Sequence, residues 1–509
     1  MAIKLYRKVY KLSFILIGSL FFATACKKEP KVAPVAPVIP IPIASSREEL
    51  TKDSIFLYAK ETYYWNDALP SYDVFKPRTF STFKSEVDKI KTFKIDPSTG
   101  KPIDKYSFLD DGSLSAELGG TAGDYGFSAN FNNGDRNDLR VRIVYPNSPA
   151  GAQNVTRGDQ IIKLNGNPNV NGNTQSNVDF LNNAIFGNNA TVTMTLRKKN
   201  GTSVDVSINR GSYSLNPVLF DSTYTVGARK VGYVVYSSFT TNSKDKLVAV
   251  FAKFASAGIS EVIVDLRYNG GGSVATAENL TNLIAPSSAT GQIMYTTFWT
   301  KTMQDGKATI LKNQKFMAEG RDGVTRLYSY FDYDYKPTEE AGNIERFKKL
   351  GTLGSLTRAY FIVSGSTASA SELVINNLKP VMDVKLIGRK TYGKPVGFFA
   401  LKIDKLDLYI PQFETKNSKN EGGYYDGMVV DKDDFDDIGK NFGDPTERLL
   451  ANALNYAEKG SFLAVKPGAD RISSVSPLVK QDVESINQEL NSHDFKGMVE
   501  NRLPKLKKQ

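Results

Sequence analysis

The spacing of apolar positions along the chain divides it into three folded segments of different character. Residues 45 to about 109 have the spacing of helices, with Ser46 as a candidate N-cap. Residues 118–210 hold short apolar runs that alternate with Asn-Gly turns, which is typical of a compact β-domain. From about residue 230, strand and helix patterns alternate, and this order predicts the βαβ units of an α/β domain.

Individual elements can be placed within the last two segments. The strands expected in the β-rich segment are Leu139–Val144, Thr191–Arg197 and Ser203–Asn209. Those expected in the α/β segment are strands Val231–Tyr236, Glu261–Leu266 and Ala359–Val363 and helices Lys244–Ala257, Ala275 onward and Ala370–Asn377. A chain of 509 residues, 40% of them apolar, is long enough to bury several such cores.

The first 25 residues have the pattern of a secretory signal peptide. A basic start is followed by the apolar stretch Leu12–Phe22, which is shorter than the ~20 residues of a membrane-spanning helix. Small residues then precede Cys26, an arrangement that resembles the lipobox of bacterial lipoproteins, although Ala23 replaces the more usual Leu. The resemblance implies lipidation of Cys26 and anchoring to the outer membrane of the cell envelope, on a side left open. A secreted protein with an incidental cysteine is the alternative.

Composition narrows the classes of function. Lys and Arg number 65 against 54 Asp and Glu, a net charge of +11. Four of the basic residues lie in the first 25, and without them the balance of 61 to 54 leaves +7, too little and too dispersed to predict nucleic-acid binding. One cysteine and one histidine, His493, exclude an intrachain disulfide and leave too few ligands for His/Cys zinc sites. A Ser-His-Asp triad would depend on His493, far from every Gly-rich or Ser-rich motif.

Three stretches of the α/β segment carry candidate chemistry. Residues 262–272 (VIVDLRYNGGG) read as a buried strand that enters a Gly-rich turn, where backbone N–H groups are free to face an anion. Residues 367–372 (TASASE) place small side chains between a strand and a helix, so the helix N-terminus can stabilise negative charge. Residues 385–394 end a further strand and include Lys394.

Together these stretches resemble the C-terminal processing peptidases, or tail-specific proteases, a family of Ser-Lys endopeptidases. The resemblance covers about residues 118–457 and implies Ser369 as nucleophile and Lys394, 25 residues later, as general base. It further implies Glu372 as the carboxylate that positions this dyad, an oxyanion hole at the N–H groups of Gly271 and Ala370, and neither metal nor cofactor. A buried lysine with a lowered pKa can act as a base, which allows serine chemistry without histidine.

The β-rich segment resembles a PDZ domain. Tyr125, Gly126, Phe127 and Ser128 match its carboxylate-binding loop, and residues 148–166 match the segment that closes its barrel. Such a domain binds free protein C-termini by loop N–H groups and by strand addition. The resemblance therefore implies protein or peptide C-termini as substrates.

Several alternatives stay open. Ser371 competes as nucleophile and Lys390 as base, and Phe398 stands where many family members carry Gln. Phe398 is the one hint of a catalytically degenerate, peptide-binding lipoprotein. Residues 388–394 also fit the start of a P-loop, but Pro395 stands where the Mg²⁺-binding Ser or Thr is required. The acidic run 431–437 departs from an EF-hand loop and reads as a solvated loop.

The expected architecture is an α/β protease core with ClpP- and crotonase-like βαβ units, a β-rich PDZ domain and a small helical N-terminal domain. The expected division of the chain is signal peptide 1–25, lipidated Cys26 with a Pro-rich linker 26–44, helical domain 45–117, PDZ domain 118–212, Ser-Lys peptidase domain 213–460 and a polar basic tail 461–509. The tail lies outside the resemblance, and the sequence assigns it no role. The oligomeric state stays open.

Overall fold

The computed structural model of the protein describes residues 43–320, 322–464, 477–492, 494–500 and 502–507. The predicted signal peptide, Cys26 and nearly all of the Pro-rich linker lie outside the described residues, as does His493. From Ala44 onward the chain forms one unit. No helix among the described residues is long and apolar enough to cross a membrane.

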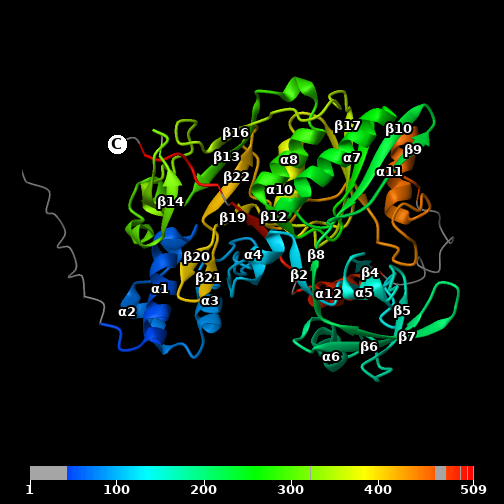
Figure 1. Cartoon of the computed structure of the whole chain (residues 1–509), viewed down its shortest axis with the longest axis horizontal. Coiled ribbons are helices and arrows are strands. Elements are labelled where there is room, and N and C mark those ends of the chain that lie inside the picture. Colours follow the sequence, from blue (N-terminus) through cyan, green and yellow to red (C-terminus); the bar gives the residue numbers. More distant parts are fainter. Residues whose placement is uncertain (1–42, 321, 465–476, 493, 501, 508–509) are drawn as a thin grey trace, which may run out of the picture. The chain divides into compact units, whose positions relative to one another are not determined.

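A six-stranded sheet forms the centre of the α/β segment (Figure 1). In sheet order its strands are β23 (Lys432–Asp433), β18 (Asp383–Gly388), β17 (Arg358–Val363), β11 (Glu261–Asp265), β10 (Arg229–Tyr236) and β9 (Val218–Val226). Only β9 runs antiparallel to its neighbour. Every residue of β11 is buried, as expected for a parallel strand with both faces covered. The predicted strands at 231–236, 261–266 and 359–363 are confirmed within a residue or two at each end.

Helices cover both faces of this sheet. Their bounds are α7 (Lys244–Ala257), α8 (Val274–Ile284), α10 (Ala370–Leu378) and α11 (Arg448–Lys459). The buried side chains of α7, α8 and α10 share a core with Val234, Val262 and Phe361 of the sheet. Those of α11 pack on the opposite face, against Tyr233 and Ile263. The predicted helices at 244–257, from 275 and at 370–377 are confirmed.

The N-terminal helices do not form a core of their own. They are α1 (Arg47–Thr62), α2 (Tyr72–Phe75), α3 (Phe83–Lys91) and α4 (Ser113–Leu118). The predicted N-cap is confirmed, because Ser46 Oγ accepts a hydrogen bond from Glu49 N. The buried face of α1 belongs to the same core as α7 and α8. The segment also contributes a strand, β1 (Phe108–Asp110), to a sheet with β21 (Leu406–Tyr409) and β20 (Leu401–Ile403).

The β-rich segment has a five-stranded antiparallel sheet with its own core. Its strands are β3 (Phe127–Phe131), β4 (Leu139–Val144), β5 (Gln160–Leu164), β6 (Thr191–Arg197) and β7 (Ser203–Asn209). The helices α5 (Pro149–Ala152) and α6 (Gln175–Phe186) belong to the same segment, and β2 (Thr121–Asp124) pairs with β8 (Gly211–Ser214) at its border. The three strands predicted here are confirmed residue for residue, and burial in β6 alternates with a period of two.

Smaller sheets surround these two centres. A four-stranded sheet has the order β16 (Ile344–Arg346), β13 (Ile293–Trp299), β22 (Phe413–Asn417) and β19 (Val396–Gly397). The hairpin β14 (Lys315–Glu319) with β15 (Thr325–Ser329) and the short helix α9 (Lys301–Gln304) complete this region.

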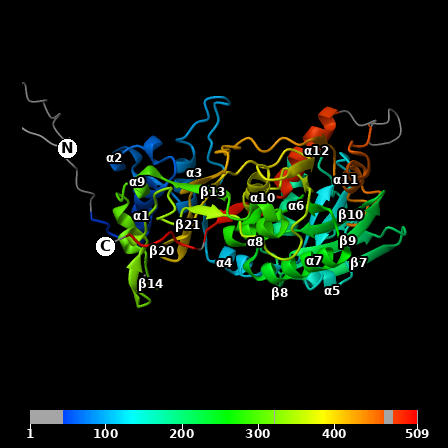
Figure 2. The same cartoon turned by 90° about the horizontal axis from the view of Figure 1, so that it is seen from above.

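The described residues of the C-terminal tail are part of the fold. It forms α12 (Pro477–Leu490) and β24 (Gly497–Val499), and β24 pairs in parallel with β12 (Gly271–Ser273). Figure 1 shows this red segment passing beside β12 and β19, and Figure 2 shows α12 beside α6. The sequence offers little signal for this arrangement, because the strand is three residues long and pairs with residues more than two hundred positions away.

Candidate active site

The Gly-rich turn after β11 holds one side of the candidate site. Gly271 and Gly272 have φ angles of 111° and 136°, which only glycine adopts without strain. A Cβ at Gly271 would lie 2.3 Å from Gly497 O and 3.0 Å from Ala370 N, so the turn also needs glycine for close approach. The N–H of Gly271 donates to Asn269 Oδ1 at 2.9 Å. This predicted oxyanion donor therefore already has a side-chain acceptor.

Ser369 stands in the turn between β17 and α10. Its φ of 61° and ψ of −108° are sterically costly for a residue with a side chain, and such strain persists only where the surroundings enforce it. The side chain is buried, and Oγ has no hydrogen-bond partner among the residues that the structure describes. Ala370 follows as the first residue of α10, so its N–H has no acceptor in a preceding helical turn. The turn thus joins a free hydroxyl to a helix N-terminus.

Glu372 ties the serine turn to the lysine loop. Its Oε2 accepts hydrogen bonds from the backbone N–H groups of Ser369 and Lys394, both at 2.8 Å. Its Oε1 accepts from Gly393 N at 2.7 Å and from Thr391 Oγ1 at 2.5 Å. Burial raises the pKa of Glu372, and these four donors oppose that rise. The carboxylate therefore positions both candidate catalytic residues through their backbones and does not contact the Lys394 amine.

Lys394 is fully buried, with its amine in an apolar and aromatic setting. Nζ lies 3.8 Å from the centre of the Phe398 ring and 5.3 Å from that of Tyr106. It donates a hydrogen bond to the backbone O of Lys496 at 2.8 Å. Burial lowers the pKa of Lys394 well below the usual lysine value, against the opposing charges of Asp104 and Glu372. A neutral amine at this position is a competent proton acceptor.

The rival residues have other partners. Ser371 is buried and its Oγ donates to Asn269 O at 3.0 Å. Lys390 is half exposed, and its amine pairs with Asp426 at 2.9 Å. Neither therefore has the unpartnered hydroxyl of Ser369 or the buried amine of Lys394. The described residues contain no group of three or more His, Cys, Asp or Glu side chains arranged to hold a metal ion.

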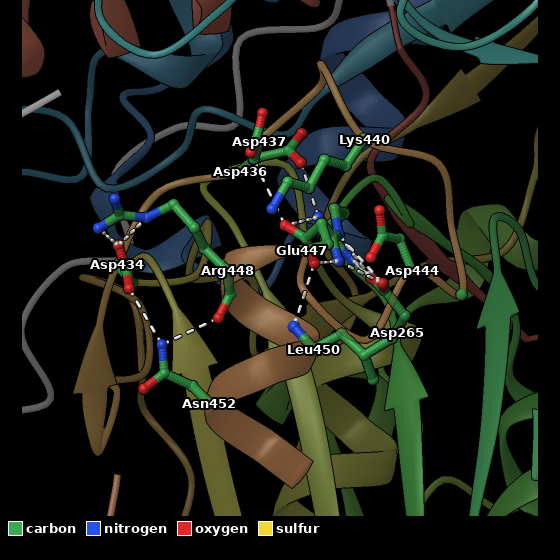
Figure 3. A network of polar contacts seen from close by, with 12 residues as sticks. Asp265, Asp434, Asp436, Asp437, Lys440, Asp444, Glu447, Arg448, Leu450 and Asn452 are labelled. Carbon is green, nitrogen blue, oxygen red and sulfur yellow. Dashed lines mark hydrogen bonds and ion pairs between the residues drawn. The ribbon is translucent and has the colours of Figure 1, made fainter. Parts of the chain in front are cut away.

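A buried ion network fixes the end of β11 next to the Gly-rich turn (Figure 3). Arg267 pairs with Asp265, Asp436 and Glu447 at 2.6–3.0 Å. Arg157 of the β-rich segment also reaches Asp436, at 2.7 Å. The interpretation of residues 431–437 as a solvated loop is therefore wrong for Asp436. This carboxylate joins Arg157 of the β-rich segment to Arg267 after β11, and the acidic composition of the run does not indicate its basic partners.

The predicted carboxylate-binding loop lies at the start of β3. Tyr125 is buried and its hydroxyl donates to Asn189 O, while Gly126 N donates to Asp124 Oδ1 at 2.7 Å. Phe127 pairs with Val144 in the sheet. Ser128 Oγ accepts from Arg142 Nε at 2.8 Å. A cavity of about 570 Å³ extends from Phe127 and Ser128 to Gly270 and Gly271, so it links this loop to the Gly-rich turn.

Comparison with known proteins identifies the family of the α/β segment. The sequence profile described as "Peptidase family S41" matches residues 230–422, which hold the Gly-rich turn, Ser369, Glu372 and Lys394. The α/β segment thus matches peptidase family S41. The matched S41 region contains β10, β11, β17 and β18 but leaves the β-rich segment and the tail outside.

Two relatives and one solved structure show how far the likeness of this chain extends. A carboxyl-terminal-processing protease of Picosynechococcus sp. is 24% identical over 55% of this chain and 56% of its own length. The chloroplastic C-terminal processing peptidase of Tetradesmus obliquus is 22% identical over 56% and 55%. The chain thus spans about half the length of these curated relatives. A crystal structure described as a putative S41 protease of Bacteroides fragilis shares the fold, with a TM-score of 0.54 and 22% identity over 82% of this chain and 98% of that one.

Three residues of the candidate site were not predicted from the sequence. Asn269 holds the N–H of Gly271, Thr391 donates to Glu372, and Lys496 supplies the carbonyl that the Lys394 amine contacts. The first two stand inside the quoted motifs, where their polar side chains were the available signal. Lys496 lies in the tail, and no local pattern connects it to residue 394.

Proposed function

We propose that this protein is a serine endopeptidase that cleaves proteins near their C-termini through an acyl-enzyme. The observation that carries the proposal is the arrangement around Glu372, which binds the backbones of Ser369 and Lys394 together in a buried site. The unpartnered Ser369 Oγ and the buried Lys394 amine are the nucleophile and base that such chemistry requires.

Each residue has a defined step. The neutral Lys394 amine accepts the Ser369 proton while Oγ attacks the scissile carbonyl, and the resulting ammonium then protonates the leaving amine. Water next attacks the acyl-enzyme, with Lys394 again as base. The Ala370 N–H at the start of α10 is placed to bind the oxyanion, and Gly271 is its proposed partner. The Gly271 N–H would have to exchange its bond to Asn269 for one to the substrate.

The β-rich segment, residues 118–212, is the proposed tail-capturing PDZ domain. Its support is the edge strand β3, which begins at Phe127 within the proposed loop, and the cavity that leads from there to Gly271. The curated relatives are named for processing at carboxyl termini, which agrees with this choice of substrate. A degenerate, purely peptide-binding protein is the less favoured alternative, because the Lys394 amine keeps its buried setting beside Phe398.

The proposed location is the bacterial cell envelope, with a lipid on Cys26 as the outer-membrane anchor. The support is the signal-peptide pattern that ends at this cysteine. In cells, Cys26→Ser should leave the membrane fraction while the folded part keeps its activity. A Cys26→Ser protein that still sediments with membranes would argue for an uncleaved anchor.

Labelling with a fluorophosphonate tests the proposed chemistry, because this probe reacts with activated serines. We expect one modified residue, Ser369, identified by peptide mass spectrometry, and no labelling of Ser369→Ala. Ser371→Ala is the matched control, because its hydroxyl is bonded to Asn269 O. Modification of Ser371 in place of Ser369 would show that Ser371 is the nucleophile.

A further inference from the structure

The C-terminal tail lies on the surfaces that a peptide substrate would need. We propose that residues 477–507 are an intramolecular competitor of substrate, which occupies both the edge of the β-rich sheet and the catalytic cleft and thereby inhibits the protein. The inference rests on the proposed peptidase function and adds its regulation. Two sets of contacts, the cavities beside the tail and one ion pair support it.

The first set lies on β3, the edge strand that follows the proposed carboxylate-binding loop. Helix α12 packs on β3 and α6, and its Val483 and Leu490 are buried in the core of the β-rich segment. Asn487 accepts from Phe131 N at 2.8 Å and donates to Phe131 O at 3.0 Å. One side-chain amide therefore takes both backbone groups of Phe131, at the edge where an added peptide strand would pair.

The second set lies in the cleft. Strand β24 pairs with β12, and Gly497 N donates to Gly270 O at 3.0 Å. On its other side Met498 O accepts from Phe398 N at 3.0 Å. The Lys394 amine donates to Lys496 O, and Gly497 O lies against Gly271. Backbone carbonyls of the tail thus contact the Lys394 amine and the Gly-rich turn. These are the positions at which a substrate carbonyl would be bound.

The third observation concerns space around the tail. Two cavities, of about 580 and 570 Å³, are both lined by Asp494 and Phe495. The first also reaches Tyr106 and Tyr392 near Lys394, and the second reaches Ser128. Residues 494–495 therefore form part of a wall between them, and their withdrawal would join the two spaces next to Gly271.

An ion pair holds the tail at this point. Arg142 is almost fully buried, and its Nη2 binds the Asp494 carboxylate at 2.5 Å while its Nε donates to Ser128 Oγ at 2.8 Å. The tail thus places a carboxylate on a buried guanidinium next to the loop proposed to receive carboxylates. A buried pair that loses one charge is strongly weakened, so Asp494 is the residue at which to release the tail.

Full-length Asp494→Asn and Leu490→Ala test the inference, with Ser485→Ala on the exposed face of α12 as the matched control. We expect fluorophosphonate labelling of Ser369 at least fivefold faster in both release variants and an unchanged rate in the control. Circular dichroism of each variant verifies folding. Labelling of the folded release variants at or below the wild-type rate would make the tail a structural part of the protein and overturn the inference.

A second measurement needs neither catalysis nor a release variant. Full-length Ser369→Ala is followed by hydrogen–deuterium exchange with and without a decapeptide that ends in a free valine carboxylate. Bound peptide should lower the protection of amides in residues 482–500. Bound peptide with unchanged protection there would also overturn the inference. Absence of Ser369 labelling in every variant would instead contradict the proposed peptidase function, and the exchange result would still decide the role of the tail.

Discussion

The amine of Lys394 lies 3.8 Å from the centre of the Phe398 ring, four residues further along the chain. The ring stands where a glutamine side chain would offer the lysine a polar contact. An aromatic face attracts the charged ammonium by about 0.5–2 kcal/mol, but burial acts against that charge, and burial prevails in lowering the pKa of Lys394. Phe398 is therefore compatible with a neutral base.

This relationship predicts opposite effects of two substitutions. Phe398→Leu removes the aromatic face and should lower the Lys394 pKa further, whereas the amide oxygen of Phe398→Gln should stabilise the ammonium and raise it. The midpoint of the pH dependence of fluorophosphonate labelling should move down in the first variant and up in the second. Identical midpoints in both variants would show that residue 398 does not set the protonation of Lys394.

The lowered pKa of Lys394 fixes the sign of the pH dependence in the wild-type protein. A lysine with a lowered pKa loses its proton at a lower pH than usual, so the neutral base is present above that lowered value. The labelling rate of Ser369 should rise with pH up to that point and stay level above it. Lys394→Arg should abolish labelling at every pH, because a guanidinium keeps its proton. A rate that keeps climbing towards the usual lysine pKa would contradict the assignment.

Glu372→Gln should change both the free energy of unfolding and the pH dependence of the reaction. The carboxylate accepts four hydrogen bonds, and an amide would turn a donor towards some of these N–H and O–H groups, at a cost of roughly 1–3 kcal/mol for each group left unpaired. The free energy of unfolding should fall by a few kcal/mol.

If Glu372 had a purely structural role, its substitution would change only the free energy of unfolding. The Glu372 charge, however, also raises the Lys394 pKa. The midpoint of the pH–rate profile should therefore move to lower pH in Glu372→Gln. Glu458→Gln, an exposed glutamate on α11, is the matched control and should change neither quantity. If the midpoint of the pH–rate profile did not move in Glu372→Gln, the role of Glu372 would be structural only.

Capture of substrate tails predicts a preference for free carboxyl ends. Amidation removes the charge that the loop at Tyr125–Ser128 is proposed to bind and leaves its donors poorly paired, at a cost of about 1–3 kcal/mol, or roughly five- to a hundredfold. The kcat/KM of an amidated peptide should be lower by this factor than that of the same peptide with a free end. Equal values would leave the protein an endopeptidase whose β-rich segment does not select tails.

The sequence predicts elements in which apolar and polar residue types alternate with a regular local period. Helix α7 and strands β4, β6 and β7 have the residues expected of them, because side-chain spacing alone distinguishes period 3.6 from period 2. The family resemblance of residues 367–372 likewise led to Ser369 and Glu372, and the Glu372 carboxylate binds the backbone N–H groups of Ser369 and Lys394.

The parts that could not be predicted depend on long-range pairing. Lys496 O contacts the Lys394 amine, and Gly497 pairs with Gly271, across more than a hundred and two hundred residues respectively. Three residues of strand carry no detectable pattern, and the polar composition of residues 461–509 resembles a solvated tail. The Asp436–Arg267 contact was not predicted for the same reason, because the sequence does not show which distant basic residue an acidic residue contacts.

The central claim, that Ser369 and Lys394 act as one catalytic unit, is tested most directly by the kcat/KM of three purified variants on one peptide. When two residues act as one catalytic unit, removing either of them loses nearly all of the rate enhancement that the pair provides. Ser369→Ala and Lys394→Ala should each lower kcat/KM by at least a thousandfold, and the double variant should be no more than a few-fold worse than either. Substantial turnover by Ser369→Ala, or a double variant whose loss equals the product of the two single losses, would contradict the account.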